Sequence, residues 1–332
     1  MTGTVVKSGA GDGIATVTAT RIAGRGTLAQ LFVPSRTPDH TLVGREGAPI
    51  VLVLGGISAN RHVTRSGADQ APGWWEGIVG TGRAIDTSVR RVLGVEFRDG
   101  GRARDGRPAR LVTTHDQAAH VVQLLDELGI DRLDAAVGAS YGGMVALALA
   151  ERWPERVRHV VVICAAHEPH PMAVGLRAVQ RRIVELGLDT GRAAEAMALG
   201  RAVAMTTYRT AREFSDRFDV TPTHTDGSTE FDVERYLVRS GEKFAERMRP
   251  ERFLALSLSA DLHRVRPESV VVPSTVIALQ GDTLVPPAQM RAMARRMPHV
   301  RAVHTLKTRF GHDAFLTEHV RLGAILSASL SD

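Results

Sequence analysis

Three residues of the types that together carry out nucleophilic catalysis stand directly after apolar runs of this chain. Ser140 lies within Gly-Ala-Ser-Tyr-Gly, residues 138–142, between an apolar run and a helical pattern. Asp282 and His312 follow two later apolar runs. A serine in Gly-x-Ser-x-Gly between a strand and a helix lies on a sharp turn that exposes its hydroxyl. The pattern therefore predicts Ser140 as a nucleophile, Asp282 as the acid and His312 as the base.

The chemistry of these three side chains is acyl transfer. A serine hydroxyl is a poor nucleophile, so His312 takes its proton while Ser140 attacks an ester or thioester carbonyl. Asp282 fixes the tautomer of the imidazole. The backbone N–H groups of Ile57 and Tyr141 are the expected donors to the oxyanion. The resulting acyl-serine leaves two outcomes open, because either water or a second hydroxyl can take the acyl group.

The elements that must position these residues alternate in kind. Buried strands are predicted at residues 49–54, 157–165 and 274–279, and helical patterns separate them. Helix between strands is the rhythm of an α/β sheet. Together with the chain order nucleophile, acid, base, it predicts the α/β-hydrolase fold, a mostly parallel central sheet flanked by helices.

The predicted domain organisation is a core interrupted by an insertion. Residues 171–262 are mostly helical in pattern, and we expect them to form a lid over the serine, where substrate pockets are favoured. Residues 1–170 and 263–332 then form the hydrolase core. Near the N-terminus, alternation within residues 16–33 predicts an antiparallel hairpin. Residues 35–47 are expected to be a polar connector.

Composition limits the possible function classes. The chain has 332 residues, a net charge of +6 and scattered arginines, which fits a solvated surface or a modest attraction for anionic substrates. Zinc-finger, RNP, helix-turn-helix and dinucleotide signatures are missing, as is metal-ligand spacing, so we expect no nucleic-acid partner and no metal. The single cysteine, Cys164, is expected to be a buried structural thiol. Without a signal-peptide core or a membrane-length apolar run, a cytoplasmic protein with no membrane partner is expected.

Several further motifs are similar to those of the homoserine O-acyltransferases, the acyl-CoA-dependent enzymes of methionine biosynthesis that have the α/β-hydrolase fold. The marks are Gly-Gly-Ile-Ser-Ala at 55–59, Gly-Trp-Trp-Glu-Gly at 73–77, Ala-Ile-Asp-Thr at 84–87, the segment 236–244, the elbow itself, and Gly-His-Asp-Ala-Phe at 311–315. The resemblance implies a ping-pong acyltransferase that uses acyl-CoA as co-substrate and L-homoserine as acceptor. It also implies no permanently bound cofactor and a homodimer formed through the lid.

The resemblance also implies substrate-binding residues. Asp313 corresponds to an aspartate that contacts the homoserine amine, and Tyr208 to a tyrosine near the site. An arginine on the first lid helix, Arg181 or its neighbour Arg182, corresponds to the residue that binds the homoserine carboxylate. From the residues alone, a solvated helix face for Arg181 and a helix cap for Asp313 remain alternatives.

The acyl donor and the acceptor stay open at this stage. Arg61 stands where members that use acetyl-CoA tend to have a small residue, and a cation there suits the distal carboxylate of a succinyl group. Succinyl-CoA therefore competes with acetyl-CoA as the expected donor. Serine competes with homoserine as acceptor, since one methylene contributes only about 1–3 kcal/mol of discrimination. Outside this reaction, the alternatives are an esterase or thioesterase on the same triad and a non-enzymatic binding protein.

Overall fold

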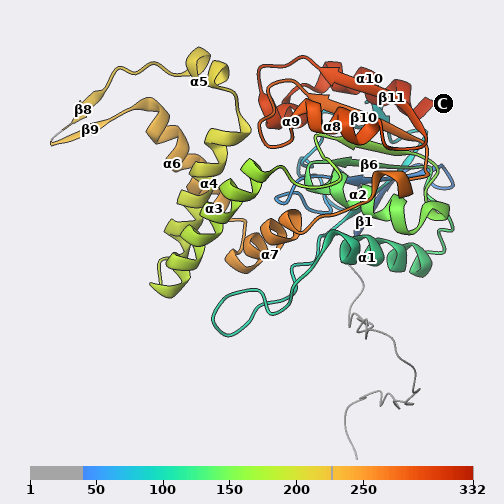
Figure 1. Ribbon diagram of the computed structural model, residues 1–332, viewed down its shortest axis with the longest axis horizontal. Helices are drawn as coiled ribbons and strands as arrows, with labels where there is room; N and C mark the ends of the chain where they lie inside the picture. Colours follow the sequence, from blue (N-terminus) through green and yellow to red (C-terminus); the bar gives the residue numbers. More distant parts are fainter. Residues whose placement is uncertain (1–39, 226, 332) are drawn as a thin grey trace, which may run out of the picture. The chain divides into compact units, whose positions relative to one another are not determined.

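Seven strands form the central sheet of this computed structural model, which describes residues 40–225 and 227–331. The strands are β1 His40–Gly44, β2 Ile50–Leu54, β5 Arg91–Val95, β6 Ala135–Ala139, β7 Val160–Ile163, β10 Ser274–Leu279 and β11 Val300–Leu306. They lie in the order β1-β5-β2-β6-β7-β10-β11. Only the pairing of β1 with β5 is antiparallel among the neighbours of this described sheet. The predicted fold class is therefore confirmed (Figure 1).

The two faces of the sheet are buried under different helices. These helices are α1 Thr114–Glu127, α2 Tyr141–Arg152, α8 Pro287–Ala294 and α10 His319–Ser331. Leu52 and Val162 belong to the cluster that includes residues of α1, α2 and α8, whereas their neighbours Val51 and Val161 belong to the cluster with α10. Side chains alternate between faces along a strand. Burial on both faces explains why the strands are continuous apolar runs in the sequence.

Between β7 and β10 the chain forms a series of helices, as the pattern of residues 171–262 predicts. The helices are α3 Pro171–Asp189, α4 Ala193–Tyr208, α5 Ala211–Arg217, α6 Asp232–Ala245 and α7 Pro250–Asp261. Helix α4 packs against α3 and α6, and α3 packs against α7. Figure 1 shows α3, α4 and α6 to the left of the sheet, not on one of its two faces. We call residues 171–262 the helical insertion; its role as a lid and the domain boundaries stay predictions.

Parts of the chain without a clear strand pattern contain short strands. Strand β1 lies inside the connector predicted for residues 35–47, and this prediction is corrected. Because β1 is a sheet edge with half-buried side chains, it lacks the apolar run that marks the inner strands. The pairs β3 Val79–Gly80 with β4 Ile85–Asp86, and β8 Thr223–Thr225 with β9 Ser228–Glu230, are too short for a periodic pattern.

Two remaining features complete the description. A 3₁₀ turn at Gly311–Asp313 and the short helix α9 Ala314–Thr317 precede α10. The hairpin predicted within residues 16–33 lies outside the described residues. Among the helices that the structure describes, none combines the length and the apolar character that crossing a bilayer requires.

The junction of β6 and α2 depends on two glycines. A Cβ atom at Gly138 would lie 2.3 Å from the carbonyl oxygen of Gly142, and one at Gly142 would lie 2.3 Å from the carbonyl oxygen of Leu54. Because these carbonyl oxygens belong to the backbone, they cannot rotate away from an added Cβ as the end of a long side chain could. The glycines therefore let the helix approach the strands closely enough to form the sharp turn at Ser140.

We expect Gly142→Ala to lower the free energy of unfolding by about 1–3 kcal/mol, because overpacking a tight site costs that much. Gly175→Ala is the matched control, since a Cβ at this α3 position meets nothing within 4 Å. It should be neutral or stabilising by up to about 1 kcal/mol, because alanine favours a helix. Urea unfolding of both variants measures the difference, and equal midpoints for the two would contradict this account of the elbow.

Candidate active site

Ser140 occupies a strained position between β6 and α2. Its backbone φ of 54° and ψ of −121° are unusual for a residue with a side chain. Such conformations cost of order 1–3 kcal/mol and persist where the surrounding structure enforces them. Here the enforcing contacts are the hydrogen bond from the Ser140 N–H to the Ile163 carbonyl at 2.9 Å and the close packing at Gly142. The turn presents the serine hydroxyl at the carboxyl end of the sheet.

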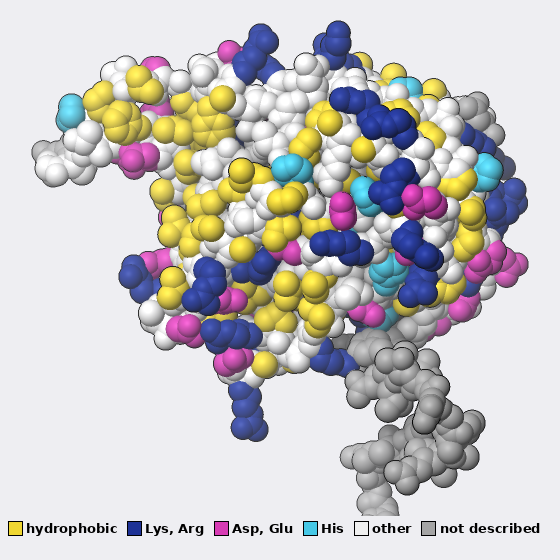
Figure 2. Space-filling view, in the orientation of Figure 1, with side chains coloured by type: hydrophobic (Ala, Val, Ile, Leu, Met, Phe, Trp, Pro, Cys, Tyr) yellow, Lys and Arg dark blue, Asp and Glu magenta, His cyan; other side chains and the backbone are white. Residues whose placement is uncertain are grey.

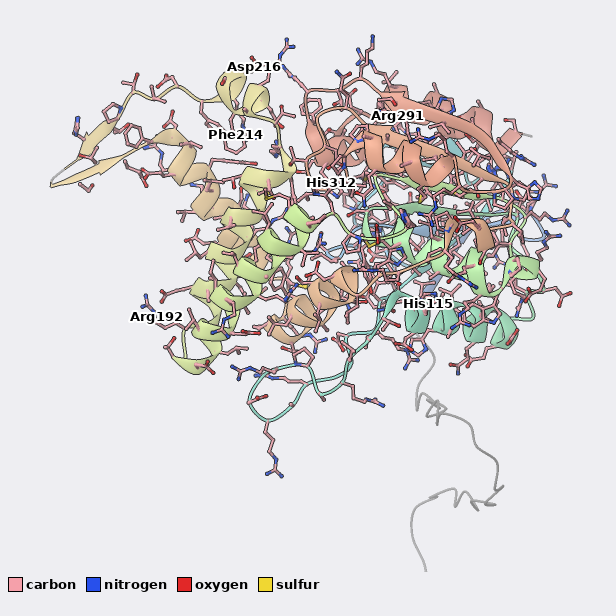
Figure 3. The ribbon with its side chains drawn as sticks, viewed as in Figure 1. His115, Arg192, Phe214, Asp216, Arg291 and His312 are labelled. Carbon is pink, nitrogen blue, oxygen red and sulfur yellow. The ribbon has the colours of Figure 1, made fainter. Side chains whose placement is uncertain are left out.

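The structure brings Ser140, His312 and Asp282 together. His312 Nε2 lies 2.8 Å from Ser140 Oγ, and His312 Nδ1 lies 2.7 Å from Asp282 Oδ2. Since a carboxylate only accepts hydrogen bonds, Nδ1 carries the proton and Nε2 is left to accept from the serine. The other carboxylate oxygen, Oδ1, accepts from the N–H groups of Leu284 and Val285, each at 2.9 Å. Figure 3 shows His312 between the helical insertion and the core.

The environment of His312 tunes its basicity. Burial disfavours the charged ring, but the negative charge of Asp282 and its hydrogen bond more than offset burial and raise the pKa of His312 above 6.5. A raised pKa makes the imidazole a better acceptor for the serine proton. The nearby Asp313 acts in the same direction, whereas the positive charge of Arg177 opposes it.

Cys164 lies directly beside the acid and the base. Its potential ligand atom and those of Asp282 and His312 lie within 4.8 Å of one another. The thiol is fully buried, and burial raises its pKa well above 9, so it stays protonated. The predicted buried thiol is thereby confirmed. Because Asp282 and both nitrogens of His312 are already engaged in the triad, we assign this group to the triad and not to a metal.

The loop after β2 borders the nucleophile, as an oxyanion loop must. The Gly142 N–H donates to the Gly55 carbonyl at 2.8 Å, which ties this loop to the elbow. A Cβ at Gly56 would lie 3.9 Å from that of Ser140, so the adjacent Ile57 is close to the hydroxyl. Tyr141 is the first residue of α2, and its N–H therefore has no acceptor within the helix. The loop after β2 and the start of α2 therefore meet at Ser140, and the N–H groups of Ile57 and Tyr141 as oxyanion donors stay a prediction.

The side chain of Tyr141 serves the core and not the oxyanion. Its hydroxyl lies 2.8 Å from Ser259 Oγ and accepts from Gln117 Nε2 at 3.3 Å. Burial raises its pKa to about 12. The ring packs edge-on against Phe97, with centroids 4.9 Å apart. These contacts hold the side chain of Tyr141 in the core, so its predicted role at the oxyanion concerns only its backbone N–H.

A tryptophan pair supports both sides of the site. The Trp74 and Trp75 rings are stacked with centroids 5.2 Å apart. Trp74 Nε1 donates to the Asn60 carbonyl at 3.0 Å, beyond the oxyanion loop, and Trp75 Nε1 donates to the Phe315 carbonyl at 2.8 Å, just after His312. The pair therefore links the loop after β2 to the segment that carries the base.

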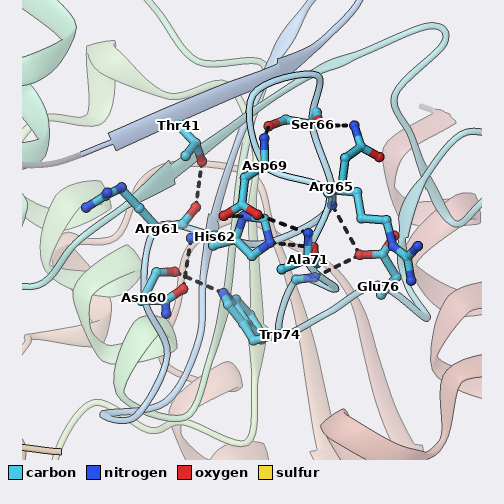
Figure 4. Close-up of polar contacts among 12 residues, drawn as sticks. Thr41, Asn60, Arg61, His62, Arg65, Ser66, Asp69, Ala71, Trp74 and Glu76 are labelled. Carbon is cyan, nitrogen blue, oxygen red and sulfur yellow. Dashed lines mark hydrogen bonds and ion pairs between the residues drawn. The ribbon is translucent and has the colours of Figure 1, made fainter. Parts of the chain in front are cut away.

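Arg61 lies on the loop that follows Asn60 and is exposed. Its backbone is fixed from two sides: the carbonyl accepts from Thr41 Oγ1 at 2.5 Å, and the N–H donates to Glu96 Oε2 at 3.2 Å. Figure 4 shows its side chain directed away from His62 and Trp74. Arg61 is therefore near the oxyanion loop along the chain, and its contacts with Thr41 and Glu96 are made by its backbone.

A single arginine of α7 bridges the helical insertion to this loop. Arg252 is largely buried, and its guanidinium donates to the Phe97 carbonyl at 2.7 Å and to the Ala59 carbonyl at 3.4 Å. It also pairs with Glu96 at 2.7 Å. Sequence reasoning missed this residue, because its three partners come from segments far from it in the chain.

Tyr208 and Asp313 both lie beside His312. The Tyr208 ring, at the end of α4, has its centroid 5.9 Å from that of His312, and burial raises its pKa. Asp313 is buried, and its Oδ2 lies 3.4 Å from Arg209 Nε. Arg209 also pairs with Glu213. Asp313 thus already has a cationic partner within the protein.

The two arginines predicted on α3 differ in their surroundings. Arg181 donates to Ser257 Oγ at 3.0 Å and pairs with Asp261 at 2.6 Å. The same buried Asp261 pairs with Arg177, one turn earlier, also at 2.6 Å. Arg182 is 74% exposed and pairs with Glu185 at 2.8 Å. The structure therefore brings Arg182 to the solvent and not to the triad, and it leaves Arg181 sharing one carboxylate with Arg177.

Arg201, on α4, is a further cation near Tyr208 that the sequence reasoning missed. Its guanidinium carbon lies 5.2 Å from the Tyr208 ring centroid and 5.0 Å from that of Phe244. None of the ion pairs among the described residues includes Arg201, so its charge has no carboxylate there. Phe244 belongs to the hydrophobic cluster of the helical insertion against which Ile57 also packs. The signal of Arg201 in the sequence was the spacing of two helical turns before Tyr208, which puts both residues on one face of α4.

This arrangement can form and break an acyl-serine. It has a hydroxyl in contact with a base, and a buried acid that orients the base. Comparison with known proteins agrees with that chemistry. The profile of the α/β-hydrolase-fold family matches residues 49–318.

Curated relatives are similar over most of their length. A homoserine O-succinyltransferase of Xanthomonas campestris pv. campestris is 42% identical over 88% of this chain and 78% of its own. A homoserine O-acetyltransferase of Geobacter metallireducens is 32% identical over 81% of this chain and 83% of its own. The crystal structure of a homoserine O-acetyltransferase from Bacillus anthracis superposes with a TM-score of 0.79 at 17% identity, covering 88% of this chain and 91% of the other.

The raised pKa of His312 leads to a pH prediction. The ring must be neutral to accept the serine proton, so kcat/KM for an activated ester such as p-nitrophenyl acetate should fall on the acid side, with a midpoint above pH 6.5. Asp282→Asn removes the charge that raises this pKa while burial remains. The midpoint should therefore move to lower pH, and kcat should fall by about 10⁴-fold, because an asparagine at this position favours the wrong tautomer of the imidazole.

Asp189→Asn is the control for this experiment, since Asp189 lies at the end of α3 and pairs with Arg107 on the surface. It should leave both the midpoint and the rate unchanged. An acid midpoint that stays in place in Asp282→Asn would show that His312 does not titrate as the base.

Proposed function

Because the chain belongs to the homoserine O-acyltransferases of the α/β-hydrolase fold, we propose that it transfers an acyl group from acyl-CoA to the hydroxyl of L-homoserine by way of acyl-Ser140. The observation that carries the proposal is the contact of Ser140 with His312 at 2.8 Å, in a chain 42% identical to a homoserine O-succinyltransferase. Acyl transfer to homoserine belongs to methionine biosynthesis. No permanently bound cofactor is needed for this chemistry.

The proposed reaction has two half-reactions that use the same three side chains. His312 Nε2 takes the Ser140 proton as Oγ bonds to the thioester carbon, and the N–H groups of Ile57 and Tyr141 hold the oxyanion. The C–S bond then breaks, and the proton passes from His312 to the departing thiolate. In the second half, His312 takes the proton of the homoserine hydroxyl as that oxygen attacks the acyl-serine, and Ser140 regains a proton when its C–O bond breaks.

We assign the acceptor carboxylate to Arg201 in preference to Arg181 or Arg182. Arg181 already has Asp261, and Arg182 faces solvent, whereas Arg201 lies beside Tyr208 without a carboxylate partner in the described chain. A cation with open donors binds a carboxylate at a lower desolvation cost than one that must first give up a partner. Asp313 supplies the negative charge for the ammonium group, in exchange for part of its contact with Arg209.

The acyl donor is a separate part of the proposal. We propose that succinyl-CoA competes with acetyl-CoA, since Arg61 adjoins the oxyanion loop and a distal carboxylate needs a cation. Serine as acceptor and water as acceptor are the two rivals to homoserine. The helical insertion, residues 171–262, acts in this proposal as a lid over the core formed by residues 1–170 and 263–332.

We further propose that the chain acts as a homodimer in the cytoplasm. Exposed apolar side chains gather on the helical insertion, where Leu186, Leu199 and Val238 are each more than half exposed (Figure 2). Such a surface is typical of an interface between proteins. Light scattering that gave the mass of one chain would contradict the dimer. No nucleic acid or membrane partner enters the proposed reaction.

The transfer reaction is tested by the release of CoA from acetyl-CoA and from succinyl-CoA, each with and without homoserine or serine. We expect release to depend on homoserine and to vanish in Ser140→Ala, because water is a poor competitor for the acyl-serine. Equal rates with and without any acceptor would indicate a thioesterase, and a preference for serine would change the acceptor. In Arg61→Ala the ratio of the succinyl to the acetyl rate should fall; an unchanged ratio would remove Arg61 from the donor site.

The acceptor site is tested by Arg201→Gln. The KM for homoserine should rise about 10- to 100-fold, because a hydrogen bond to a charged group contributes about 1.5–3 kcal/mol. Arg182→Gln is the matched control and should leave this KM unchanged, since its side chain is 74% exposed on α3. A larger effect in Arg182→Gln than in Arg201→Gln would reverse the assignment.

A further inference from the structure

A hollow of about 660 Å³ opens where residues of the helical insertion meet the core segments that precede Asp282 and His312. Gly281, next to Asp282, and Phe310, two residues before His312, line it from the core. Thr210, at the start of α5, lines it from the helical insertion. Thr210 Oγ1 donates to the Arg309 carbonyl, so the two parts of the chain are in direct contact here.

The hollow carries an excess of positive charge. Four cationic residues and one acidic residue line it. They are Arg212, Lys307, Arg309, Arg321 and Glu318. Fixed charges of one sign in a concave surface concentrate anions there.

Two of these cations have no carboxylate partner in the described chain. Arg309 and Arg212 face Asp216 on α5, at 3.3 Å and 3.9 Å, and Figure 3 shows Asp216 on that helix. By contrast, Lys307 and Arg321 appear in none of the ion pairs among the described residues. Arg321 Nη1 donates instead to the Lys307 carbonyl at 2.9 Å, which holds the two residues together.

We propose that this hollow binds the phosphate groups of the acyl-CoA donor. The inference rests on the proposed function, which supplies the donor but says nothing of where its nucleotide end lies. Acyl-CoA carries a diphosphate and a 3′-phosphate, whose oxygens accept charge-assisted hydrogen bonds from arginine and lysine. Its long neutral arm keeps these charges at the protein surface while the thioester reaches a serine inside. A hollow beside the triad loops, rich in cations and built from both parts of the chain, suits that end of the ligand.

The test compares two donors of the same acyl group in the full-length enzyme: the acyl-CoA that the wild type prefers, and the N-acetylcysteamine thioester, which lacks phosphates. In the double variant Lys307→Gln/Arg321→Gln, the KM for acyl-CoA should rise about tenfold, a factor that corresponds to about 1.4 kcal/mol. The KM for the phosphate-free thioester, the KM for homoserine and kcat should stay as in the wild type. Added salt should raise the wild-type KM for acyl-CoA, because it screens exposed charges. The difference in this KM between the wild type and the double variant should therefore become smaller.

The double variant Arg295→Gln/Arg301→Gln is the matched control, since it also removes two exposed positive charges and neither residue lines the hollow. It should leave every constant unchanged. A wild-type KM for acyl-CoA in the double variant, or an equal rise for both donors, would overturn the phosphate site and leave the proposed function standing. Absence of transfer from both donors in the wild type would instead overturn the function, and the site with it.

Discussion

The contact between His312 and Asp282 is the interaction on which the rest of the site depends. It joins two loops that are 30 residues apart in the chain and buries a carboxylate beside an imidazole. A buried charge without a partner is costly, so the carboxylate is stable here only because the ring and two backbone N–H groups share it. The same contact fixes which nitrogen faces Ser140. The same His312–Asp282 contact therefore stabilises the buried carboxylate and raises the basicity of His312.

Most of the remaining charges around the site already have an oppositely charged partner within the protein, although Arg177 and Arg181 share a single carboxylate. Asp261 pairs with Arg177 and Arg181, and Asp313 lies near Arg209. Balanced charges lose little by being buried, but they have little left to offer a substrate. Arg201 differs because its neighbours are aromatic rings. Our proposal for the acceptor carboxylate rests on this distribution of partners and not on the number of arginines.

The features that were predictable from the sequence are those with strong local patterns. The strand and helix around Ser140 form a continuous apolar run, and the triad members each follow such a run, so their places in the sheet follow from chain order alone. The edge strand β1 was missed because its side chains are half-buried and mixed. The choice among Arg181, Arg182 and Arg201 was also beyond the sequence, since it depends on Asp261, a partner from another helix. Whether an arginine is paired depends on residues that are distant in the sequence, so a short stretch of sequence around it cannot show its partner.

The bridge made by Arg252 has a consequence for motion. One guanidinium holds the carbonyls of Ala59 and Phe97 and the carboxylate of Glu96, and it is anchored on α7. Movement of α7 away from the core would break the contacts of the Arg252 guanidinium with Ala59, Glu96 and Phe97 together. It would leave the guanidinium without these partners and free the segment at Ala59, which follows the loop after β2. The position of α7 and the conformation of the segments at Ala59 and at Glu96–Phe97 are therefore coupled through one side chain.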